Sequence, residues 1–233
     1  MGNEPNVTDD GSGHFETMTP DAYAIGLNSF AAQIKKADPT ARLVGPNVLN
    51  WTFKCAGCKG DFPSGAEWTS QFVDAYRARF RQEPPLDVYA VHAYDLDWES
   101  LPQGNATRAI DQISGMRAFL DADAQLAGKP MWVSEIGIHW GYPGFEQKDG
   151  RISPKGEFDY DHVENYMRTL FGWLNANAVD LRIERWFVAG ISTSTTETFN
   201  SVWGGITFMD GLAADSPINR LGQLYRQLAG VAP

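Results

Sequence analysis

Two glutamates in this sequence stand in settings that suit acid–base or nucleophilic chemistry. Glu4 lies between Asn3 and Pro5, and Glu135 ends a short apolar run that is followed by Gly137. Two carboxyl groups at one mouth can cleave a glycosidic bond, with retention at a separation of about 5–5.5 Å and inversion at a wider one. One carboxyl must hold its proton while the other stays ionised, so their surroundings must differ. Taken alone, either could also be a solvated loop carboxylate.

Residues beside a third strand-like segment add to this pair. His92 and Tyr94 are two apart near the end of an apolar run, so both side chains point to the same face of a strand. A core histidine over a buried tyrosine is the alternative interpretation. Asn3 places an amide beside Glu4, where it could hydrogen-bond a sugar hydroxyl.

Helical and strand patterns alternate along the chain. Strands apolar on both faces that alternate with helices predict an α/β fold with a parallel sheet. The loops after the strands are long and those before them are short, which favours a site at the carboxyl ends of the strands. The predicted helices are 19–37, 64–83, 105–126, 160–177 and 217–228, and the predicted strands are 42–47, 86–94, 131–136 and 182–190. The segment 137–158 is predicted to be a long loop.

Composition excludes several classes of partner. The 233 residues are 43% hydrophobic and carry a net charge of −10, which argues against nucleic acid or an anionic membrane. No apolar run reaches the length of a membrane span. A doubly wound sheet would also bind ligands at strand ends, but no glycine-rich phosphate loop follows any strand. The histidines show no paired spacing for a metal, so no metal site is expected, and hydrolysis by two carboxyl groups needs no cofactor.

Cys55 and Cys58 are the two cysteines, in a loop rich in glycine and lysine. A structural zinc site needs about four ligands, and there is no second cysteine pair. We predict a local disulfide, with free thiols or a partial metal site left open. A disulfide suits an exported protein, so a secreted or periplasmic location is expected.

Three segments together resemble a known group of enzymes. Residues 2–5 (Gly-Asn-Glu-Pro) are similar to the Asn-Glu-Pro signature that ends strand four in clan A glycoside hydrolases. Residues 91–94 (Val-His-Ala-Tyr) resemble the end of strand six, and residues 132–137 (Trp-Val-Ser-Glu-Ile-Gly) resemble the strand-seven segment with the nucleophile. The stretch from Trp68 to Glu135 is similar to family 128 β-1,3-glucanases, and residues 44–46 to families 39 and 5.

The resemblance implies a role for each of five residues. Glu4 would be the general acid/base and Glu135 the nucleophile of a retaining β-glycosidase. Asn3 would contact the 2-hydroxyl of the sugar at the cleaved bond. Tyr94 would lie near the nucleophile, and His92 would line the same subsite.

Aromatic side chains are the remaining candidates for carbohydrate binding. The resemblance makes Trp186, near the last strand, a candidate sugar platform, with an outward core tryptophan as the alternative. Trp140 and Trp203 lie in long loops after strands, where flat rings could stack on apolar sugar faces.

The resemblance covers essentially the whole chain, as one partial catalytic domain over residues 1–233. It implies the C-terminal part of a (β/α)8 barrel, from the end of strand four to helix eight. About three βα units would precede Glu4 in the clan, so a truncated N-terminus is expected. The expected function is hydrolysis of β-glycosidic bonds in a polysaccharide or oligosaccharide. A non-catalytic carbohydrate-binding remnant, or another α/β hydrolase or oxidoreductase in which Glu4 is incidental, remains open.

Overall fold

The structure is a computed structural model of the chain. It describes residues 2–7, 18–54, 63–95, 104–138, 146–148, 151–153, 160–189, 206, 208–209, 211 and 213–229. These residues belong to two compact units. The first comprises Met1–Ala93, Asp111–Ser134 and Val179–Trp186, and the second comprises Tyr94–Ile110, Glu135–Ala178 and Phe187–Pro233. The prediction of a single domain over 1–233 stays a prediction.

Helices and strands alternate as the sequence predicts, and the main sheet is parallel. Its strands have the order β1-β2-β3-β6, while β4 and β5 form a separate antiparallel pair. Among the helices that the structure describes, none is long and apolar enough to cross a bilayer. The elements are α1 (Pro20–Ala37), β1 (Val44–Leu49), α2 (Gly65–Phe80), β2 (Val88–Tyr94), α3 (Thr107–Asp121), β3 (Met131–Gly137), β4 (Glu146–Lys148), β5 (Arg151–Ser153), α4 (Tyr160–Asn177), β6 (Ile183–Val188) and α6 (Arg220–Leu228).

The first two helices begin where hydroxyl side chains cap them. The Thr19 hydroxyl accepts a hydrogen bond from the Ala22 N–H at 3.2 Å, with Pro20 in the first turn. The Ser64 hydroxyl likewise accepts from the Glu67 N–H at 3.2 Å. Such caps satisfy backbone donors that a helix start leaves unpaired, and they confirm both predicted starts.

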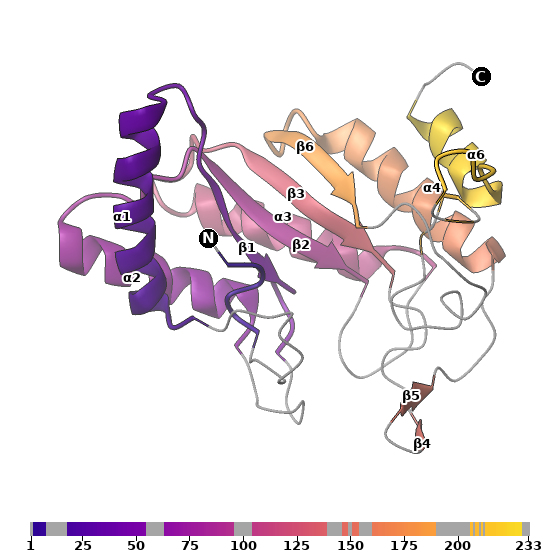
Figure 1. Ribbon diagram of the computed structural model, residues 1–233, viewed down its shortest axis with the longest axis horizontal. Coiled ribbons are helices and arrows are strands. Elements are labelled where there is room, and N and C mark those ends of the chain that lie inside the picture. Colours follow the sequence, from indigo (N-terminus) through magenta and orange to yellow (C-terminus); the bar gives the residue numbers. More distant parts are fainter. Residues whose placement is uncertain are drawn as a thin grey trace. The chain divides into compact units, whose positions relative to one another are not determined.

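Aromatic side chains fill the core between α1 and α2, which lie side by side next to β1 (Figure 1). Tyr23 packs edge-to-face on both Trp68 and Phe72, with ring centroids 5.1 Å apart in each case. Phe72 is fully buried. These three rings therefore join α1 to α2 in the first unit.

Phe30 of α1 lies at the edge of the buried face of the helix and is 44% exposed. The buried stripe of α1 includes Ala24, Leu27 and Ala31. The small alanines let the helix approach its neighbours closely, so the centre of the stripe lies toward them and Phe30 falls at its margin.

Other differences from the predicted elements lie at boundaries. The predicted strand 42–47 is displaced to Val44–Leu49, and the third helix ends at Asp121 instead of 126. A short hairpin, β4–β5, occupies part of the predicted loop 137–158. The last helix begins at Arg220, where the Asn219 side chain accepts from the Gly222 N–H at 3.0 Å. A polar cap, and not the proline at 217, therefore sets that start.

In the second unit, α4 and α6 pack together. Phe171 of α4 lies edge-to-face on Tyr225 of α6, with ring centroids 5.9 Å apart. Phe208 stacks on the same ring at 4.6 Å. The Tyr225 ring of α6 therefore contacts both Phe171 of α4 and Phe208.

Replacing Phe72 by alanine should destabilise the protein strongly, because a fully buried ring leaves a cavity that costs about 3–5 kcal/mol. The matched variant Phe30→Ala removes the same ring from a half-exposed position and should cost about 1 kcal/mol. Urea unfolding followed by tryptophan fluorescence measures both. Equal losses would contradict this description of the α1 and α2 packing.

Candidate active site

Glu4 lies in a tight turn near the start of the chain. The Val7 N–H donates to the Glu4 carbonyl at 2.9 Å, which closes a β-turn with Pro5 as its second residue. Proline suits that place because its ring fixes φ near the value the turn requires. Glu4 itself has a φ of 49°, in the left-handed region. That conformation costs a residue with a side chain about 1–3 kcal/mol, so it persists only where its surroundings hold it.

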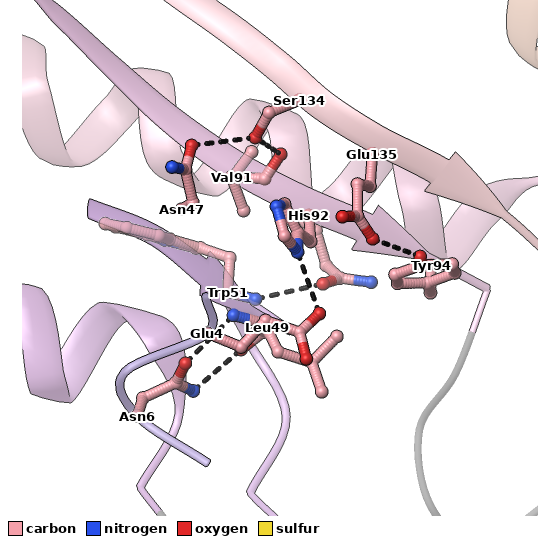
Figure 2. Close-up of polar contacts among 11 residues, drawn as sticks. Glu4, Asn6, Asn47, Leu49, Trp51, Val91, His92, Tyr94, Ser134 and Glu135 are labelled. Carbon is pink, nitrogen blue, oxygen red and sulfur yellow. Dashed lines mark hydrogen bonds and ion pairs between the residues drawn. The ribbon is translucent and has the colours of Figure 1, made fainter. Parts of the chain in front are cut away.

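The Glu4 carboxyl meets His92 of β2. Glu4 Oε1 and His92 Nδ1 are 2.7 Å apart, and the two side chains are 7% and 3% exposed (Figure 2). One proton lies in this hydrogen bond, on the imidazole or on the carboxyl according to the state of the pair. Burial without a partner would be costly for either group. The pair can therefore exchange a proton with a third group while keeping its own hydrogen bond.

Asn6 anchors this turn, a role that the sequence pattern does not predict. Its amide accepts from the Leu49 N–H at 2.9 Å and donates to the Leu49 carbonyl at 2.8 Å. It is 2% exposed, whereas Asn3, the amide predicted to bind sugar, is exposed. An asparagine after a proline is typical of turns, so local pattern gives no indication of a long-range contact. The role of Asn3 stays a prediction.

Tyr94, the last residue of β2, contacts the second glutamate. Its hydroxyl donates a hydrogen bond to Glu135 Oε2 (Figure 2). Tyr94 is buried and Glu135 is half-buried. A hydroxyl that donates to one carboxylate oxygen fixes the orientation of the carboxyl group. The arrangement thus suits a carboxylate that must be held in place to attack a carbon atom.

Gly137 makes room for the Tyr94 ring. A Cβ built on Gly137 would lie 2.5 Å from Tyr94 Cε1 and 2.8 Å from Cδ1, closer than atoms can approach. The Gly137 carbonyl accepts from the Asp95 N–H and from the Tyr166 hydroxyl, both at 3.1 Å. Burial, aided by the charge of Asp95, raises the pKa of Tyr166 well above its usual value. The Tyr166 hydroxyl therefore stays a donor and holds the strand end in place.

The two predicted residues of β2 are thus each paired with a predicted acid. His92 contacts Glu4 and Tyr94 contacts Glu135. The catalytic and sugar-binding roles assigned to all four remain predictions.

A bulge in β1 supports the strand ends with polar contacts. Asn47 has a φ of 58°, and the pairing of β1 with β2 shifts register between Pro46 and Val48. The Ser134 hydroxyl lies 3.0 Å from Asn47 Oδ1 and 3.3 Å from the Val91 carbonyl (Figure 2). The sequence analysis missed this contact because a bulge has no period that could be read.

Glu184 of β6 is another glutamate of the main sheet, and its contacts are of a different kind. Arg42 lies 2.8 Å from its carboxylate, and the Trp132 indole donates to it at 3.1 Å. The hydrogen bond from Arg42 holds the pKa of Glu184 below its usual value. This contact stabilises the folded protein above the pKa that Glu184 has in the unfolded chain. The stabilisation is lost as pH falls through the lower pKa of Glu184 in the folded protein. An ion-paired carboxylate of this kind is a structural group and a poor acid.

The remaining predicted residues have mixed outcomes. Trp186 lies on β6 and is half-buried, and its role as a sugar platform stays a prediction. Trp140, Trp203, Cys55 and Cys58 lie outside the residues that the structure describes. The expectation of no metal and no cofactor is untested.

Comparison with protein-family models places the chain. The model described as "Glycosyl hydrolase catalytic core" matches residues 2–223. The chain belongs to this family. The predicted enzyme class, glycoside hydrolase, is therefore confirmed. The comparison with curated proteins gives no match.

Solved structures show the fold of this glycosyl hydrolase core. A family 128 (subgroup V) exo-β-1,3-glucanase from Cryptococcus neoformans matches with a TM-score of 0.55 and 20% identity, over 99% of this chain and 68% of that one. A family 128 (subgroup III) curdlan-specific exo-β-1,3-glucanase from Blastomyces gilchristii matches at 0.51 and 18%, over 96% and 66%. A family 128 (subgroup I) endo-β-1,3-glucanase mutant from Amycolatopsis mediterranei, in complex with laminarihexaose, matches at 0.51 and 18%, over 97% and 69%.

These likenesses confirm the predicted fold class. The parallel sheet with helical crossovers is that of part of a (β/α)8 barrel, and the predicted similarity to family 128 of clan A holds for the fold. The chain spans about two thirds of the length of these relatives.

Gly137→Ala should destabilise the glycosyl hydrolase core by about 1–3 kcal/mol, because the added methyl group overlaps the Tyr94 ring. Gly172→Ala, in α4 of the same unit, is the matched control. Nothing lies within 4 Å of a Cβ there, so it should stabilise by up to about 1 kcal/mol. Thermal unfolding of both variants provides the measurement. If Gly137→Ala leaves the unfolding temperature unchanged, the Tyr94 ring can move aside freely.

Proposed function

We propose that this glycosyl hydrolase core hydrolyses β-glycosidic bonds in a polysaccharide by a retaining two-glutamate mechanism. The observation that carries the proposal is the pairing of each glutamate with a residue of β2: Glu4 with His92, and Glu135 with Tyr94. The two acids thus have different neighbours, an imidazole and a phenol. Retaining glycosidases need such a difference, since one carboxyl gives up a proton while the other attacks as an anion.

In the first step Glu135 forms a bond to the anomeric carbon as the glycosidic bond breaks. Glu4 donates its proton to the leaving oxygen, which departs as a hydroxyl group. The Tyr94 hydroxyl orients Glu135 before attack. The product of this step is a glycosyl ester on Glu135 and a Glu4 carboxylate that is hydrogen-bonded to His92.

In the second step Glu4 takes a proton from water, whose oxygen attacks the anomeric carbon from the face opposite Glu135. The ester bond breaks, Glu135 leaves as a carboxylate, and Glu4 is again protonated. Two inversions at one carbon give net retention. His92 stays hydrogen-bonded to Glu4 in both steps, because this hydrogen bond can form with the proton on either partner.

The substrate class we propose first is a β-1,3-glucan. The support is the fold likeness to proteins described as exo- and endo-β-1,3-glucanases, one of them in complex with laminarihexaose. A neutral polymer also suits a chain of net charge −10, which would repel an anionic one. Asn3, Trp140, Trp186 and Trp203 are the proposed sugar contacts. An extracellular or periplasmic location fits such a polymer and belongs to the proposal.

Glu135→Gln should lower kcat on β-1,3-glucan by about 10⁴-fold or more, because it removes the nucleophile. Glu4→Gln should cost about 10²–10⁴, the usual worth of general acid–base catalysis. Glu83→Gln, whose carboxylate instead pairs with Arg77 at 2.7 Å, is the control and should keep its activity. Reducing-sugar assays on β-1,3-glucan, mannan and xylan measure all three.

The anomer formed first, observed by NMR of fresh digests, tests the stereochemistry. A β product supports the retaining mechanism, and an α product contradicts it. Titration calorimetry with laminari-oligosaccharides tests the alternative function. Binding without hydrolysis in the unmutated protein would favour a carbohydrate-binding remnant over an enzyme.

A further inference from the structure

The segment that carries Glu4 meets the edge of the sheet. In the order β1-β2-β3-β6, β1 has β2 on one side and no other of these strands on its second side. An edge strand presents backbone N–H and carbonyl groups that need partners. Leu49, the last residue of β1, is buried, so its outward backbone groups need partners from within the protein.

The Asn6 side chain supplies both of those partners. Its oxygen accepts from the Leu49 N–H at 2.9 Å and its nitrogen donates to the Leu49 carbonyl at 2.8 Å (Figure 2). The same nitrogen lies 3.3 Å from the Pro63 carbonyl, just before α2. A carboxamide has the donor and acceptor of a peptide group, so Asn6 takes the place of one residue of a neighbouring strand.

The contact between Asn6 and Leu49 sets the position of Glu4 along the β1–β2 pair. Leu49 is the register partner of His92 in the β1–β2 pair. Asn6 is bound to Leu49, and Glu4, two residues earlier, is bound to His92. Glu4 also has a left-handed φ of 49°, a conformation that surrounding contacts must hold.

We propose that Asn6 is a positioning residue for the acid/base, which sets the Glu4 carboxyl against His92 by pairing with the edge of β1. The inference rests on the proposed function of Glu4. It assigns Asn6 no contact with substrate. Loss of the pairing should therefore impair proton transfer to the leaving group more than it impairs binding.

The decisive variant is Asn6→Asp, which keeps the shape. When ionised, the introduced carboxyl can accept from the Leu49 N–H but cannot donate to the Leu49 carbonyl. When protonated, it regains both functions. The ratio of variant to parent kcat should be about 0.01 at pH 7.5 and rise at least about tenfold by pH 5, since burial favours the neutral acid. KM should change by less than about threefold.

Two further variants complete the design. Asn6→Ala should show a low ratio at both pH values, because it has no proton to regain. Asn28→Asp is the matched control in the same unit. Its side-chain oxygen accepts from the Tyr76 hydroxyl at 2.8 Å, and a carboxylate can do the same, so its kcat ratio should stay near 1 at both pH values.

A second readout separates positioning from a general structural role. Aryl β-glucosides with a good leaving group need little help from an acid, whereas those with a poor one need it fully. Asn6→Ala and Glu4→Gln should therefore both lose at least about tenfold more activity on the poor leaving group. Urea unfolding at each pH gives the folded fraction, to which every rate is normalised.

The outcomes distinguish this inference from the proposed function. Full activity in Glu4→Gln would overturn the proposed function. A Glu4→Gln variant that shows the leaving-group dependence, beside Asn6 variants that show neither it nor pH recovery, would overturn the role of Asn6 alone. If Asn6→Ala does not fold, Asn6→Asp at low and high pH decides the matter.

Discussion

The buried hydrogen bond between Glu4 and His92 constrains the rest of the first unit. It joins side chains 88 residues apart, at 2.7 Å, with almost no exposure of either. Neither group could be buried at low cost without the other. The turn at Glu4, the last residue of β1 and the end of β2 must therefore lie side by side. The hydrogen bond between Asn6 and Leu49 and the register of Leu49 with His92 both bring these segments together.

The second acid depends on a different kind of support. Glu135 is bound by the Tyr94 hydroxyl, and Tyr94 finds its place because Gly137 has no side chain. The Tyr166 hydroxyl and the Asp95 N–H then hold the Gly137 carbonyl. One carboxyl thus shares a hydrogen bond with an imidazole, while the other accepts a hydrogen bond from a phenol hydroxyl. Different neighbours of this kind are what separates an acid from a nucleophile in two-carboxylate enzymes.

Much of the fold could be predicted because its signals are local. Hydroxyl caps at Thr19 and Ser64 and apolar runs ahead of polar loops give the order of helices and strands. Boundaries failed where a contact elsewhere decides them. β1 runs from Val44 to Leu49, and its pairing with β2 changes register between Pro46 and Val48. Phe30 lies outside the buried stripe of α1, where small alanines face the core.

The sequence by itself determined which residues the proposed function assigns to the chemistry. The chemical types of these residues suggest the reaction, and the two-residue spacing of His92 and Tyr94 predicts that they share one face of a strand. Only the tertiary structure decided what holds them. Asn6 on Leu49 is a contact over 43 positions, and the space at Gly137 exists only for the Tyr94 ring. No local period encodes either contact, because each depends on where distant backbone segments meet after folding.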